Sequence, residues 1–158
     1  MQAVRPSAEE LALRYIVRGD IGQLALPAAA ERGFADELWR HSCFEVFAGS
    51  VSGGAYHEFN FSPSTQWATY RFSGYRSGMQ SVDPPQPPEI DVDVAADHAQ
   101  LSARVHGLTE AHDFFGLSAV IEEMDGTKSY WALAHPPGKP DFHHKDCFAL
   151  ELPAASAS

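Results

Sequence analysis

Residues 42–72, SCFEVFAGSVSGGAYHEFNFSPSTQWATYRF, decide the fold. Apolar and polar side chains alternate in the runs 42–48, 56–61 and 67–72, and segments rich in glycine, serine and proline separate these runs. Alternation with a period of two is typical of strands that bury one face, and the separating residues favour tight turns. The stretch therefore predicts antiparallel strands, the last two of which form a β-hairpin.

The same period continues on both sides of this stretch. Residues 28–37 are predicted to form a short helix or a structured loop, and 83–88, DPPQPP, a stiff surface loop, because proline cannot donate a ladder hydrogen bond. Eight to ten short strands with no long helical period predict an all-β fold, an antiparallel β-sandwich of the jelly-roll type. Further strands are expected at 11–26, with a turn at Gly19-Asp20, and at 90–94, 100–106, 114–123, 129–134 and 148–152.

Composition limits the classes of partner. With 44% hydrophobic and 20% charged residues, the 158-residue chain can build one core, so we expect a single domain over 1–152 and a disordered tail at 153–158. The formal charge of −10 disfavours nucleic acid and anionic membrane as partners. The first ten residues do not resemble a signal peptide, so we expect a cytoplasmic location, with Cys43 and Cys147 as reduced thiols.

Aromatic and polar residues gather in three segments, 38–47, 56–76 and 130–148. No phosphate loop, dinucleotide fingerprint or nucleophile elbow accompanies them. Strand parity places Glu58 and Asn60 on one face, opposite the phenylalanines of the same run. In the first segment, an early strand start would put the tryptophan, histidine, thiol and carboxylate together on a face left free for a ligand. A flat aromatic beside a carboxylate and an amide suits a sugar, whose C–H face stacks on the ring while its hydroxyls are hydrogen-bonded.

Three motifs carry a resemblance that extends from about residue 39 to residue 152. Trp39 and Glu45, within WRHSCFEVF, resemble the start of the ligand site in family-nine carbohydrate-binding modules and in bacterial DOMON-like domains. The run 56–63, YHEFNFSP, is similar to the next strand of these modules. Residues 140–142 before CFAL resemble their closing loop, and 130–148, YWALAHPPGKPDFHHKDCF, resembles the DOMON-like group.

The resemblance implies a non-catalytic domain that binds a small polar ligand, most plausibly a sugar, without cofactor or metal. Trp39 would stack on the sugar, and Glu45 and Asn60 would hydrogen-bond it. The rim would be closed by Phe142, His143 and His144. Asn60 stands where the modules place an arginine, and Phe142 is the aromatic nearest to the place of their second tryptophan. The expected ligand-binding residues are Trp39, His41, Glu45, Glu58, Asn60, His135, Phe142, His143 and His144.

Other functions stay open at this point. DOMON-type sandwiches in some oxidoreductases hold a b-type heme through methionine and histidine, and Met79 is the candidate methionine here. An aromatic surface that docks another protein is a third possibility. Zinc is the metal alternative, because it accepts a mixed set of histidine and cysteine ligands such as His41, Cys43, His143 or His144, and Cys147.

Overall fold

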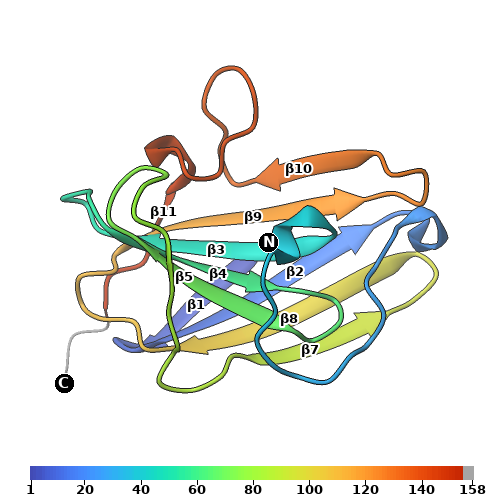
Figure 1. Ribbon diagram of the computed structural model, residues 1–158, viewed down its shortest axis with the longest axis horizontal. Helices are drawn as coiled ribbons and strands as arrows, with labels where there is room; N and C mark the ends of the chain where they lie inside the picture. The colour runs from blue at the N-terminus through green and yellow to red at the C-terminus, as the bar shows by residue number, and fades with distance from the viewer. Residues whose placement is uncertain (155–158) are drawn as a thin grey trace.

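Two antiparallel sheets pack face to face in the computed structural model, which describes residues 1–154 (Figure 1). The predicted all-β sandwich is confirmed. Within the described residues the only helical elements are three short 3₁₀ turns, η1 (Ile21–Gln23), η2 (Leu38–Arg40) and η3 (Lys145–Cys147). None of them is long enough to cross a membrane.

The chain divides its strands unequally between the two sheets. The smaller sheet has the order β1 (Gln2–Ser7), β2 (Glu10–Arg18), β8 (His98–His106), β7 (Glu89–Val94). The larger sheet has the order β10 (Lys128–Ala132), β9 (Phe114–Glu122), β3 (Cys43–Gly49), β4 (Tyr56–Phe61), β5 (Trp67–Phe72), β6 (Gln80–Ser81), and β11 (Leu150–Glu151) also pairs with β9.

Most strands lie where the sequence predicts them, and the differences have local causes. Strand β1 is additional, because QAVRPS alternates poorly and gains its strand from pairing with β2. In the run 11–26 the chain leaves the strand at Gly19-Asp20 as predicted, with β2 ending at Arg18, but η1 replaces the strand expected after the turn, and the Asp20 carboxylate caps η1 by accepting from the Gly22 amide at 3.1 Å. Residues 28–37 form a loop. Of the predicted tail, Pro153 and Ala154 lie outside any strand, and 155–158 lie outside the described residues.

The inner core fills the space between the sheets. It draws alternate residues from β2 and β8 on one side and from β3, β4 and β9 on the other. Tyr15 crosses this core, because its hydroxyl donates to the Glu45 carbonyl oxygen at 2.6 Å. The largest fully buried side chains here include Tyr15, Phe61, Phe115, Leu11, Ile90, Leu101, Leu117, Val46 and Val105.

A second apolar layer covers the opposite, outer face of the larger sheet. Phe47, Tyr56, Tyr70, Phe72 and Val120 point outward from neighbouring strands and pack beneath η2 and the segment 141–148. Every residue of β3 is consequently buried. The expectation of an open strand face is therefore wrong: covering segments bury most of it and leave only a cleft.

The buried Arg5 side chain links β1 to the loop that follows β8 and to the residue that follows β11. The Arg5 guanidinium lies 5.8 Å from the centre of the Phe115 ring. Its two terminal nitrogens donate to four backbone carbonyl oxygens, and charged donors of this kind form strong hydrogen bonds. The acceptors are the carbonyls of Ala8, Thr109, His112 and Leu152.

We expect Arg5→Ala to lower the free energy of unfolding by about 3 kcal/mol, because four backbone carbonyls lose a charged donor. Urea denaturation followed by circular dichroism measures this. Arg14→Ala is the matched control, since Arg14 is exposed and bonds only Gln100, and it should cost less than about 0.5 kcal/mol. Equal losses for the two variants would contradict a fastening role for Arg5.

Candidate functional site

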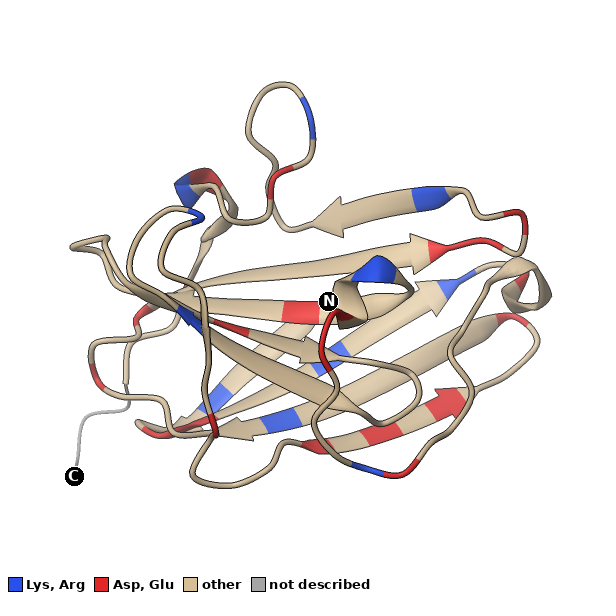
Figure 2. Cartoon of the chain, viewed as in Figure 1, with Lys and Arg blue, Asp and Glu red and all other residues tan. Residues whose placement is uncertain are grey.

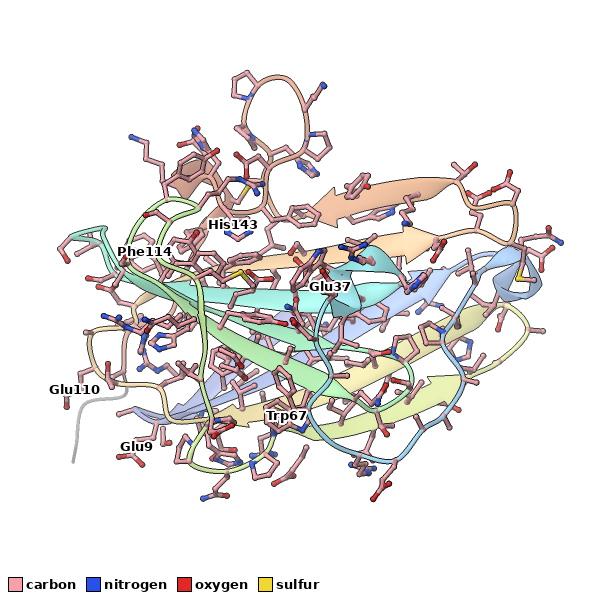
Figure 3. All side chains as sticks on the ribbon, in the orientation of Figure 1. Glu9, Glu37, Trp67, Glu110, Phe114 and His143 are labelled. Carbon is pink, nitrogen blue, oxygen red and sulfur yellow. The ribbon has the colours of Figure 1, made fainter. Side chains whose placement is uncertain are left out.

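A cleft of about 430 Å³ opens on the outer face of the larger sheet. Figure 3 shows His143 above one end of this sheet and Glu37, which leads into η2, above its middle. The cleft lies between these two covering segments. Its lining residues are Trp39, Glu45, Glu58, Phe72, Arg76, Met79, Val120, Tyr130, Pro140, Phe142 and His143.

Sheet register assembles the polar floor of the cleft. On β3 and β4, Glu45 lies opposite Asn60 and Phe47 lies opposite Glu58, so the two carboxyl groups are diagonal neighbours on one face. Strand β9 places Ser118 opposite Glu45 on the other side. Period-two alternation therefore suffices to bring two acids, an amide and a hydroxyl together from three strands.

Both acids are almost fully buried, with Glu45 exposed by 2% and Glu58 by 4%. The Asn60 amide donates to Glu58 Oε1 at 2.9 Å, and the Ser118 hydroxyl donates to Glu45 Oε2 at 3.1 Å. Burial raises the pKa of Glu58 to about 7. Burial and the neighbouring Glu58 raise the pKa of Glu45 well above its usual value. Burial therefore favours the protonated form of both acids.

The cations near these acids are already engaged or neutral. Arg76 donates through Nη2 and Nε to Asp141 Oδ1, at 2.7 and 3.1 Å. His143 has its Nε2 3.7 Å from Glu58 Oε2. Burial, and then the Arg76 charge, lower the pKa of His143 to about 4, so its ring is neutral at pH 7.

The tautomer of His143 follows from its other contact. The Tyr56 hydroxyl oxygen accepts from the Arg76 amide at 3.3 Å and lies 2.7 Å from His143 Nδ1, and in the tautomer that we assign the hydroxyl donates to this nitrogen. The ring then carries its own proton on Nε2, the nitrogen that faces Glu58. His143 thus presents a donor to the cleft.

Aromatic rings form the walls. Trp39 stands edge-on to Tyr70, with ring centres 5.5 Å apart and planes at 69°. Phe142 packs on Tyr130 at 6.2 Å, and Phe72 contacts the His143 ring at 4.9 Å. Trp39, on η2, is half buried, and its indole lines one side of the cleft.

The cleft brings together five of the nine residues expected to bind a ligand, namely Trp39, Glu45, Glu58, Phe142 and His143. Asn60 is fully buried and reaches the cleft only through its hydrogen bond to Glu58. As the sequence predicts, Glu58 and Asn60 share a face opposite Phe59 and Phe61, which lie in the inner core.

The remaining three histidines lie elsewhere. The strand begins at Cys43, so His41 ends the 3₁₀ turn instead and bonds Glu122 through Nδ1 at 2.8 Å. His135 is exposed in the loop after β10, with its ring 6.2 Å from that of Phe142. His144 points away from its neighbour because it caps η3, accepting from the Asp146 amide, and it lines an adjacent hollow.

Six lining residues fall outside the expected set: Phe72, Arg76, Met79, Val120, Tyr130 and Pro140. The register of the hairpins predicts two of them. Phe72 lies on the same face as Tyr70, which pairs with Glu58, and Tyr130 pairs with Val120. No sequence signal indicates Arg76, which adopts a positive φ of 50° in a loop and pairs with an aspartate from a distant loop.

The cysteines are free and buried, as expected for reduced thiols. Cys43 lies on the outer face with its sulfur 3.8 Å from Asn60 Oδ1, and Cys147 donates to the Asp141 carbonyl oxygen at 3.2 Å. In the described residues no three His, Cys, Asp or Glu side chains are grouped as metal ligands. The ligand set suggested for zinc is therefore not assembled.

Comparison with protein-family models and with curated proteins gave no match. Among solved structures, the fold is similar to that of a putative carbohydrate-binding protein from Bacteroides uniformis ATCC 8492, with a TM-score of 0.58. The superposition covers 89% of this chain and 71% of the other, at 12% sequence identity. At that identity the likeness concerns the β-sandwich fold.

Two glycines let the segment over the cleft lie close to the sheet. A Cβ on Gly116 would stand 2.8 Å from the Cys147 carbonyl oxygen, and one on Gly49 would stand 2.8 Å from the Phe148 ring. Both positions face outward from neighbouring strands. The absence of side chains here lets residues 141–148 pack down beside the cleft.

We expect Gly116→Ala to lift this segment and to destabilise the protein by about 1–3 kcal/mol. The Cys147 thiol should then react faster with a thiol reagent, as measured by absorbance, because its cover loosens. Gly33→Ala is the control, since a Cβ there meets nothing within 4 Å. Unchanged thiol reactivity in Gly116→Ala would show that the segment does not depend on this contact.

The raised pKa of Glu58 predicts a pH-dependent stability. The folded state binds more protons than the unfolded state between about pH 4.5 and 7, so the contribution of Glu58 to the free energy of unfolding falls as pH rises through that window. Glutamine keeps the shape without titrating. We expect the free energy of unfolding of Glu58→Gln, measured relative to wild type, to rise by about 3 kcal/mol between pH 4.5 and about pH 8.

Urea denaturation of both proteins over that pH range measures the difference. The pKa values of His112 and His143 are lowered to about 4, so these groups act with the opposite sign in the same window in both proteins. Glu31→Gln, at an exposed loop position, should show no such trend. A pH-independent difference for Glu58→Gln would rule out a buried, titrating Glu58.

Proposed function

We propose that the cleft binds the ring of a carbohydrate without chemically changing it. The observation that carries this proposal is the combination of aromatic walls with a floor of two buried carboxyl groups. A volume of about 430 Å³ lies within the range of small-molecule sites, about 300–1,000 Å³. Hydroxyl groups need paired acceptors and donors, whereas the C–H face of a sugar needs an apolar plate, and the cleft offers both.

Each lining group takes a definite part in this proposal. The Trp39 indole stacks on the sugar face. Glu45 and Glu58 accept from hydroxyl groups, and each can also donate while it keeps its proton. The Nε2–H of His143 donates to a sugar oxygen from the opposite side. The sandwich likeness to the Bacteroides protein, described as a putative carbohydrate-binding protein, supports this choice over other small polar ligands.

Isothermal titration calorimetry with a panel of mono- and disaccharides tests the proposal. We expect saturable binding that Trp39→Ala weakens about ten-fold or more, because the stacking surface is lost. Trp131→Ala is the matched control: this tryptophan is 58% exposed on β10 and lies outside the cleft. Absence of binding across the panel, or equal losses in the two variants, would refute carbohydrate binding at this cleft.

A further inference from the structure

We propose that the cleft selects sugars that carry a protonated amine over neutral sugars of the same size. This inference rests on the proposed function and names the ligand class more narrowly. It follows from an imbalance in the floor of the cleft: Glu45 and Glu58 are buried together, and the one arginine among the lining residues, Arg76, is already paired with Asp141.

The charged and titratable groups around the two acids establish this imbalance. Arg76 is the cation that lines the cleft, and Asp141 already holds it through two hydrogen bonds. His143 contributes a neutral ring. The remaining neighbours on β3, β4, β5 and β9 are uncharged at pH 7, namely Cys43, Tyr56, Asn60, Tyr70 and Ser118.

The excess of carboxyl groups over free cations in the cleft is a local feature and does not follow from the net charge of the chain. Figure 2 shows acidic residues mostly in loops and along β7, whereas the middle of the larger sheet carries few. Two of the 21 acids line the cleft. Surface acids are solvated and screened, but a buried pair without a counter-ion strongly favours either protonation or a cationic ligand.

The unused hydrogen-bond acceptors of the two carboxyl groups also favour an ammonium as the ligand. Among residues 1–154, Ser118 is the side-chain donor to Glu45 and Asn60 is the side-chain donor to Glu58 at hydrogen-bond distance, so these side chains leave most acceptor sites of the two carboxyl groups unused. A hydroxyl supplies one donor. An ammonium supplies three donors and a positive charge, and the aromatic residues that line the cleft, Trp39, Tyr130 and Phe142, would add cation–π attraction.

Binding of an ammonium would displace protons from the floor. In the free protein burial favours the protonated forms of both acids, and a positive ligand would favour their ionised forms. The proton leaves the carboxyl group for the buffer, and the ammonium takes over as its electrostatic partner. An amino sugar should therefore release protons on binding, whereas a neutral sugar should not.

Calorimetry near pH 7 with glucosamine, glucose and N-acetylglucosamine separates these cases, because acetylation removes the charge and keeps the nitrogen. We expect glucosamine to bind about ten-fold or more tightly than the other two, with proton release detected as a dependence of the binding enthalpy on the buffer. Glu58→Gln should abolish the preference and the release, and Glu31→Gln, on an exposed loop, should retain both. If Glu58→Gln does not fold, as judged by circular dichroism, Glu45→Gln tests the same point.

The outcomes distinguish the two proposals. Equal affinity for the three sugars, or a preference for glucosamine that survives in the glutamine variant, would overturn the amine selectivity and leave carbohydrate binding intact. Failure of all three sugars to bind would overturn carbohydrate binding itself, and the selectivity with it. Tighter glucosamine binding that depends on Glu58 supports both.

Discussion

The register between β3 and β4 is the constraint on which both layers of this protein depend. The register that pairs Glu45 with Asn60 points Glu45 and Glu58 outward. The same register points Phe44 and Phe61 into the inner core. A shift by one residue would exchange these faces, burying carboxyl groups between the sheets and exposing phenylalanines. The inner core thus holds the register, and the register positions the floor of the cleft.

Burial of the two acids depends in turn on the covering segments. The outer layer needs η2 over Tyr70 and residues 141–148 over the two glycines, and without them Glu45 and Glu58 would face water and titrate normally. Their burial costs folding free energy, as the raised pKa of Glu58 records. Groups that are held at such a cost and left without a counter-ion are characteristic of binding sites.

The alternation of residues predicts the sandwich and half of the site, because period two is a local property of strands. Glu58 and Asn60 could be placed on one face from their own run alone, and Glu45 from its neighbours. Trp39 is an instructive intermediate case: the residue lines the cleft, but from a 3₁₀ turn and not from the extended strand expected. Pairing of Arg76 with Asp141 joins two loops 65 residues apart, which no local pattern encodes.

Separation of the two layers also explains how one sandwich can hold a polar site. The inner core supplies the stability and contains none of the cleft's lining side chains, so the outer layer can carry costly buried acids without interrupting the packing between the sheets. Tyr15 connects the two layers, and it reaches the backbone carbonyl of Glu45, not the side chain. The position of Glu45 is therefore fixed through its backbone, while its carboxyl group remains available to a ligand in the cleft.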